Sequence, residues 1–123
     1  MTYLFRAKTE VVGYVTLAMA SVRKERLSKD LRKAHRFKDI PCLRLAQIAR
    51  KSTYTKRGLG RIMVAWAFDK ASRLSQEVGC RYVILDSEPD KKEHYEKYLW
   101  FKALPLRRGD KTVLMYFDLG RRA

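Results

Sequence analysis

The feature that most constrains this chain is a strand-like segment that passes through a glycine pair into a helix. Apolar residues dominate IPCLRLAQIA, and we predict a strand over Cys42–Ala49. The sequence TKRGLGR follows at 55–61. Apolar residues at helical spacing then predict a helix from about Gly58 to Val78, with Gly79 ending it. A strand that leads directly into an amphipathic helix is typical of an α/β fold.

The remaining segments complete a mixed sheet. Apolar and β-branched runs at Tyr3–Ala7 and Val11–Ser21 predict a β-hairpin, and Arg81–Leu85 and Val113–Leu119 predict two more strands. Ser87 and the acids after it predict the start of a helix that contains KKEHYEKYL. A chain of 123 residues with 46% apolar residues is long enough for one core. We therefore predict a single α/β domain over residues 1–123, with helices flanking a mixed sheet.

The glycine pair has two possible interpretations. Glycine serves any tight turn, so a plain loop is one of them. The other is a phosphate cradle, because the free N–H groups and the dipole at a helix start attract anions. Gly58 and Gly60 would let a phosphate approach the backbone, and Lys56, Arg57 and Arg61 would add charge.

The net charge of +15 is unusually high for so short a chain. Such a field attracts nucleic acid, phosphate-rich cofactors or anionic membrane surfaces. Many of the cations gather between residues 22 and 39, which we read either as a solvated connection or as an anion-binding arm. The candidate nucleic-acid-binding residues there are Arg23, Lys24, Arg26, Lys29, Arg32, Lys33, Arg36 and Lys38.

Several classes of protein are not expected. The N-terminal residues lack the pattern of a signal peptide, and no apolar run is long enough for a membrane span, so we expect a cytoplasmic protein without membrane contact. Cys42 and Cys80 lie in no CxxC pattern, and His35 and His94 stand far apart in the sequence, with no set of metal ligands around either. We therefore predict two buried thiols and no metal site.

The stretch from RLAQIARKSTYTKRGLGR to HYEKYLWF closely resembles the core of the GNAT acyltransferases. In that family a Q/R-x-x-G-x-G/A segment holds the pyrophosphate of acetyl-CoA. The likeness extends to VVGYVTLAMASV and IPCLRLAQIA, and together these segments resemble the GNAT toxins that acetylate the amino acid on charged tRNA. The resemblance runs from about Thr2 to Leu119.

The resemblance implies a set of site residues. The backbone of Ile48, Ala49 and Arg50 would pair with the pantetheine arm of acetyl-CoA, and the amides from Thr55 through Lys56, Arg57, Gly58, Leu59 and Gly60 to Arg61 would bind the pyrophosphate. Tyr95 matches the tyrosine of the family's FYExxGF helix. A phenol is protonated at neutral pH and can give its proton to a departing thiolate. The alternative for Tyr95 is an aromatic ring packed under its helix.

The sequence departs from the family at several points. Thr55 stands where Gln or Arg is usual, Arg50-Lys51 where Val-Asp is common, and Leu99-Trp100 replaces Gly-Phe after the tyrosine. The chain also starts at what resembles the family's second strand, so the first strand and helices are missing. It would then be truncated, complete itself as a homodimer, or lack activity.

We thus expect an N-acetyltransferase that uses acetyl-CoA, with direct attack by a primary amine and with charged tRNA as the first acceptor to test. Asp86 and Glu88 are the nearest candidate bases, although capping the next helix is the alternative role for that cluster. Two rival functions remain open. One is acetylation of a protein or small amine, and the other is a basic nucleic-acid-binding module without catalysis.

Overall fold

The computed structural model describes residues 1–51 and 58–121. This part of the chain has an α/β fold with a mixed β-sheet, as predicted. The strands are β1 (Thr2–Ala7), β2 (Glu10–Arg23), β3 (Asp39–Arg50), β4 (Tyr82–Ser87), β5 (Lys102–Ala103) and β6 (Val113–Asp118). The α-helices are α1 (Lys29–Arg32), α2 (Leu59–Val78) and α3 (Lys92–Tyr98). Short 3₁₀ turns complete the order: η1 (Lys24–Arg26), η3 (Pro89–Lys91) and η4 (Leu119–Arg121).

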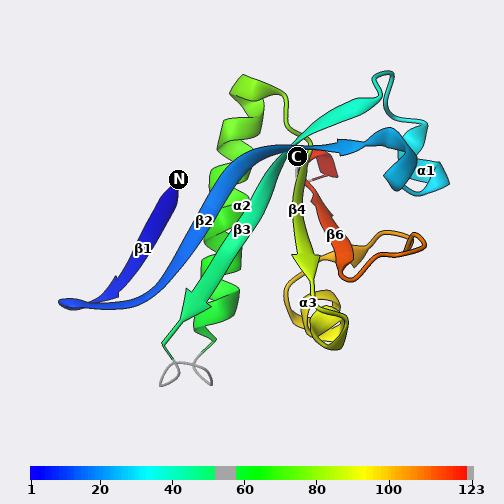
Figure 1. Cartoon of the computed structure of the whole chain (residues 1–123). Helices are drawn as coiled ribbons and strands as arrows, with labels where there is room; N and C mark the ends of the chain where they lie inside the picture. Colours follow the sequence, from blue (N-terminus) through cyan, green and yellow to red (C-terminus); the bar gives the residue numbers. More distant parts are fainter. Residues whose placement is uncertain (52–57, 122–123) are drawn as a thin grey trace.

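The six strands form one sheet in the order β1-β2-β3-β4-β6-β5 (Figure 1). All neighbouring strands are antiparallel except β3 and β4, which are parallel. The predicted hairpin is confirmed as β1 and β2. The sheet therefore consists of two antiparallel halves, and the parallel β3–β4 pair joins them.

Helix α2 covers one face of the sheet (Figure 1). Its buried residues recur at helical spacing: Met63, Val64, Ala67, Phe68 and Ala71. They pack against the inward side chains of the central strands in the larger of two apolar clusters. The predicted stop at Gly79 is confirmed, since φ is +72° there and its N–H donates to the Ser75 carbonyl at 3.0 Å. No helix in the described part of the chain meets the length and apolarity that a membrane span requires.

The opposite face of the sheet has its own, smaller apolar cluster near α1. Leu27 and Leu31 point into it from the cation-rich segment and are almost fully buried, beside Ile40 and Tyr82. Thus the 22–39 segment is not only a solvated connection, because its two leucines close the core at that end of the sheet.

The helix start predicted at Ser87 is wrong. Ser87 is the last residue of β4, 1% exposed, and its hydroxyl donates to the Glu88 carbonyl at 2.9 Å. The chain then makes the η3 turn, with Pro89 at its first position, before α3 begins. Burial of the strand end outweighs the capping preference of serine. The two-residue strand β5 was not predicted, because so short a segment has no periodicity to detect.

His35 links the cation-rich segment to the sheet and makes stability depend on pH. Its Nε2 lies 2.6 Å from the Tyr82 hydroxyl. Burial, reinforced by the nearby Arg81 charge, lowers the pKa of His35 below the ordinary value near 6.5. The unfolded chain therefore binds the proton more readily, so this contribution to stability is present above about pH 6.5 and is lost as pH falls below it.

We expect the free energy of unfolding to fall between pH 7.5 and pH 5.5, and to fall less in His35→Gln. Urea titrations at the two pH values measure this difference. The matched control is His94→Gln, at an exposed histidine on α3, which should retain the full pH dependence. An equal fall in His35→Gln and the parent would assign the dependence to other groups.

Candidate active site

The site lies where the two halves of the sheet separate. Strand β3 pairs with β4 only at Cys42–Arg44, opposite Tyr82–Ile84. Beyond these pairs β3 continues to Arg50 and β4 continues to Ser87, and the two strands diverge (Figure 1). The β3 backbone at residues 48–50 therefore pairs with β2 on one side, while its other edge has no partner strand among the described residues. A peptide-like group has free donors and acceptors to bind there.

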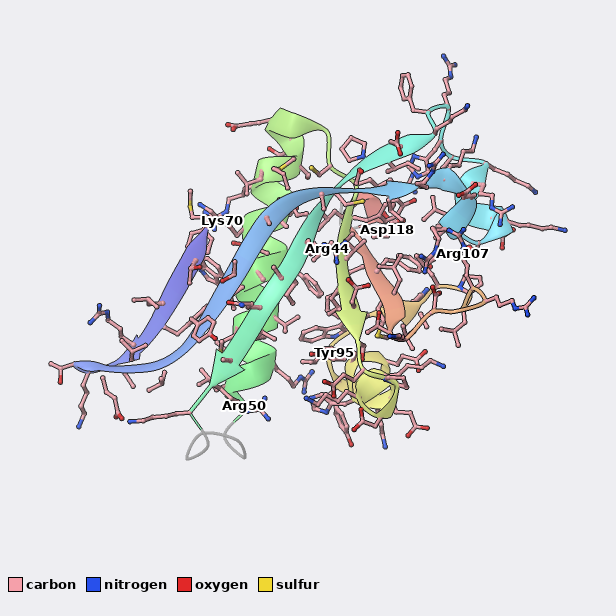
Figure 2. The ribbon with its side chains drawn as sticks, viewed as in Figure 1. Arg44, Arg50, Lys70, Tyr95, Arg107 and Asp118 are labelled. Carbon is pink, nitrogen blue, oxygen red and sulfur yellow. The ribbon has the colours of Figure 1, made fainter. Side chains whose placement is uncertain are left out.

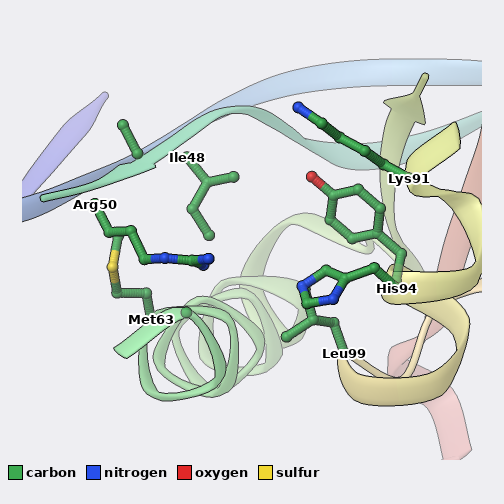
Figure 3. Close-up of a pocket in the computed structure, with 9 residues that line it drawn as sticks. Ile48, Arg50, Met63, Lys91, His94 and Leu99 are labelled. Atoms are coloured by element: carbon green, nitrogen blue, oxygen red, sulfur yellow. The ribbon is translucent and has the colours of Figure 1, made fainter. Parts of the chain in front are cut away.

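A cavity of about 520 Å³ opens beside this free edge (Figure 3). It is lined by Ile48, Ala49, Arg50, Gly60, Met63, Lys91, His94, Tyr95 and Leu99. Four elements of the fold contribute to it: the end of β3, the first turns of α2, the η3 turn and α3. A volume of this size is in the range of small-molecule sites.

The start of α2 makes one wall of this cavity electropositive. Gly58 precedes the helix with a φ of +74°, a conformation that glycine adopts without strain. A Cβ placed on Gly60 would lie 2.6 Å from Nη1 of Arg50, so the Arg50 side chain occupies the space that this glycine leaves. The first turn of α2 contains no acidic residue. Arg50 adds positive charge to the helix dipole at this wall, and Lys91 adds charge from the η3 turn across the cavity, so the cavity suits a phosphate group (Figure 3).

Tyr95 lies between this cavity and a second one. The second cavity, of about 280 Å³, is lined by Tyr14, Leu45, Ala46, Gln47, Ile48, Leu85, Asp86 and Tyr95. Ile48 and Tyr95 line both cavities. Figure 2 shows Tyr95 across from Arg50, the two coming from α3 and β3. Tyr95 is therefore placed to contact a group bound in either cavity.

The backbone holds Tyr95 in a defined position. The N–H groups of Leu99 and Phe101 both donate to the Tyr95 carbonyl at 3.2 Å, which closes the end of α3. The Tyr95 ring lies edge-on to Phe101, with 6.0 Å between the ring centroids. The ring is half-buried and packs against the larger apolar cluster, and Tyr95 also lines both cavities.

The two candidate bases differ in position. Asp86 lines the second cavity and forms an ion pair with Arg44, across the point where β3 and β4 separate. Glu88 lies 3.9 Å from Lys91 in an exposed pair and lines neither cavity. Asp86 is therefore the carboxylate at the site. It does not cap a helix, since β4 continues through it.

The structure brings together most of the residues that sequence reasoning selected. Ile48, Ala49, Arg50, Gly60 and Tyr95 line one cavity, and Gly58, Leu59 and Arg61 form the adjoining helix start. Thr55, Lys56 and Arg57 lie outside the described residues. Sequence reasoning missed Lys91, His94, Met63 and Leu99. The i, i+4 spacing of Lys91 and Tyr95 was the available signal for Lys91.

Neither cysteine takes part in the site. Cys42 and Cys80 are free and buried. Burial raises the pKa of Cys42 to about 12, and burial also raises the pKa of Cys80. Within residues 1–51 and 58–121, no group of three or more His, Cys, Asp or Glu side chains is placed to hold a metal ion.

The cation-rich segment forms a second electropositive region, at the end of the sheet away from Tyr95 (Figure 2). A cavity of about 360 Å³ there is lined by Arg23, Lys24, Glu25, Arg32 and Lys38. Arg32 is anchored, with its Nε donating to the Leu27 carbonyl at 2.8 Å. Lys29, Lys33 and Arg36 are exposed nearby. Arg26 instead binds Asp110 at 3.1 Å and is largely buried, which gives it a structural role.

Comparison with known proteins identifies the fold. No family model and no curated protein matches the chain. Among solved structures, the toxin AtaT in complex with acetyl-methionyl-tRNAfMet matches with a TM-score of 0.82 at 23% identity, over 97% of this chain and 71% of AtaT. A mutant of KacT matches with a TM-score of 0.78 at 20% identity, over 89% of this chain and 64% of KacT.

A third structure, AtaTR bound with acetyl-CoA, matches with a TM-score of 0.69 at 27% identity, over 89% of this chain and 63% of that chain. The chain thus spans about two thirds of the length of these proteins. The sheet order, the divergent β3–β4 pair and these matches lead to one conclusion: the chain has the fold of the GNAT toxins.

Proposed function

We propose that the protein is an acetyl-CoA-dependent N-acetyltransferase in which a primary amine attacks the thioester directly. The position of Tyr95 carries this proposal, because it lies where an electropositive cavity and a second cavity meet. The first cavity suits the donor and the second suits the acceptor. Similarity to AtaTR, whose structure contains acetyl-CoA, supports the choice of donor.

The donor cavity matches the chemistry of acetyl-CoA in two parts. The free edge of β3 at residues 48–50 offers N–H and C=O groups to the amides of the pantetheine arm. The start of α2, with Arg50 and Arg61, offers N–H groups and positive charge to the pyrophosphate. Thr55, Lys56 and Arg57 belong to this proposed phosphate site by sequence. Acetyl-CoA itself supplies an activated acetyl group as a thioester.

The transfer needs few groups from the protein. As the amine nitrogen bonds to the thioester carbon, the carbon–sulfur bond breaks and the amine gives up a proton to solvent water. Tyr95 protonates the departing sulfur and is later reprotonated from solvent. An α-amino group has an ordinary pKa of about 8, so a useful fraction is neutral without a base, whereas a lysine amine at about 10.4 needs help. Buried thiols disfavour a covalent relay through cysteine.

Calorimetry with acetyl-CoA and an assay for transfer of labelled acetyl test the proposal. We expect one donor to bind per chain and label to appear on an amine. Absence of both binding and transfer would reject the function. Binding without transfer to any amine would reject the catalytic part alone.

For the acceptor, we propose an amine carried by RNA, with charged tRNA tested first. The charge of +15 exceeds what CoA requires, and four cations surround the 360 Å³ cavity beside α1. The likeness to AtaT, whose structure contains an acetylated methionyl-tRNA, supports the same choice. Label that appears on the aminoacyl fraction of total charged tRNA would agree with this acceptor. Label found only on peptides or small amines would favour the rival acetyltransferase.

We expect neutralisation of Arg23, Lys24 and Lys38 to glutamine to weaken RNA binding and to flatten its salt dependence. The plot of log K against log salt has a negative slope, and this slope should become shallower by about 0.9 for each duplex phosphate that the variant no longer neutralises. Arg32 is left in place because it also supports the local backbone. Filter binding at several salt concentrations measures the slope, and the affinity for acetyl-CoA should not change.

The matched control removes three exposed cations elsewhere, at Arg6, Lys97 and Lys111. It lowers the net charge equally and should alter the slope less. Equal effects of the two triple variants would mean that general charge, and not this cavity, binds RNA. Tight RNA binding by a chain that transfers acetyl to no amine would favour the non-catalytic module.

A further inference from the structure

Trp100 has a backbone conformation that its residue type disfavours. It follows α3 with a φ of +66°, between the two residues whose N–H groups bind the Tyr95 carbonyl. This left-handed position after a helix usually belongs to glycine. Among the described residues only Lys8, in the first hairpin, is another non-glycine residue with positive φ. A strained conformation of this kind persists only where contacts with the surrounding structure hold it in place.

The strained backbone places the indole against the first turns of α2. Trp100 lies edge-on to Phe68, with 6.1 Å between ring centroids, and together with Ala65 and Phe117 they line a shallow cavity of about 230 Å³. Trp100 is 43% exposed. The face of its indole lies under the guanidinium of Arg61, whose Cζ is 5.1 Å from the ring centroid.

Within the described part of the chain, the Trp100 ring is the aromatic face on which the Arg61 guanidinium stacks. Arg61 lies in the first turn of α2, and within residues 1–51 and 58–121 it forms no ion pair with an acidic side chain. An unpaired arginine side chain samples many rotamers, and ordering it on binding costs entropy. Stacking on an aromatic face removes much of that freedom before the ligand arrives.

We propose that Trp100 is a positioning residue for donor binding, which holds the Arg61 guanidinium beside the start of α2 for the phosphates of acetyl-CoA. The inference rests on the proposed function. It also gives a reason for a tryptophan at a position where glycine would be unstrained: glycine would leave Arg61 without its support. Trp100 touches no reacting atom, so it acts through Arg61 alone.

A double-mutant cycle measured by calorimetry with CoA tests this role. Trp100→Leu keeps apolar bulk but removes the aromatic face, and we expect the affinity for CoA to fall about 2- to 5-fold. Trp100→Phe keeps an aromatic face and should restore most of the affinity. Arg61→Ala should weaken binding about 10-fold or more, and adding Trp100→Leu to it should cause no further loss.

The matched control is Tyr98→Leu, which removes an exposed ring on α3 that stacks with Lys97 at 5.4 Å, and it should leave CoA affinity unchanged. If Trp100→Leu lowered the affinity for CoA equally in the parent and in the Arg61→Ala variant, the inference would be overturned, because Trp100 would then act without Arg61. An unaffected Trp100→Leu would overturn it as well. Failure of the parent to bind CoA would instead reject the proposed function.

Discussion

Tyr95→Phe is expected to reduce the rate of acetyl transfer by about 10²- to 10⁴-fold, the usual contribution of a positioned general acid. The substitution removes only the hydroxyl, so the half-buried ring continues to pack against the larger apolar cluster. The affinity for CoA should stay within about twofold of the parent, since the proposed phosphate-binding groups lie on other elements. Steady-state rates with labelled acetyl-CoA, combined with calorimetry, separate the two effects.

Tyr98→Phe is the matched control for this experiment. Tyr98 lies on the same helix, 46% exposed, and lines neither of the two cavities at Tyr95. Its loss of a hydroxyl should not affect turnover. If Tyr95→Phe were as active as the parent, the tyrosine would have no role as proton donor, and water would have to protonate the leaving group.

Gly58→Glu is expected to weaken CoA binding at least about 100-fold. A carboxylate before the first turn of α2 would repel the phosphates and would itself neutralise the positive end of the helix dipole. A Cβ at Gly58 meets no atom of residues 1–51 and 58–121 within 4 Å, so we expect the loss to be electrostatic, with backbone strain added by the φ of +74°. Calorimetry measures the affinity, and circular dichroism measures the retained helix.

Gly79 provides the control for strain. It has a φ of +72° at the other end of α2, and a Cβ there again meets no atom of the described residues within 4 Å. Gly79→Glu thus repeats the strain and the charge away from the cavity and should leave CoA affinity intact. Gly58→Asn tests strain with little charge, because asparagine tolerates this conformation, and it should bind CoA within a few-fold of the parent. Loss of binding in Gly79→Glu would mean that helix stability, not local charge, controls the affinity.

The sequence predicted those helices and strands whose apolar residues recur with a clear period. The stripe of α2, the hairpin and the buried run of β4 are confirmed because the pattern in each reflects burial on one face or on both. The start of α3 was misplaced because Ser87 has the residue type of a helix cap but the burial of a strand end. Capping preferences are worth about 1 kcal/mol and yield to tertiary packing.

The sequence predicted which residues meet in the site only where those residues lie close together along the chain. Gly58, Gly60 and Arg61 lie in one short segment, so their meeting at the start of α2 follows from local structure. That Tyr95 and Ile48 line the same two cavities depends on how α3 returns to the divergent strands. No local pattern encodes that return, and the resemblance to GNAT proteins supplied it. The left-handed Trp100 was also beyond sequence rules, since those rules favour glycine there.

The short β3–β4 pairing affects how such a protein can change over evolutionary time. Much of the proposed donor contact comes from backbone groups at a free strand edge and at a helix start. Backbone groups are the same in every residue except proline, so most substitutions along β3 and α2 leave those contacts in place. Selection then acts on where strands end, where glycines fall and on a few side chains such as Tyr95. A chain of this kind can lose most recognisable sequence similarity and still retain the shape of its site.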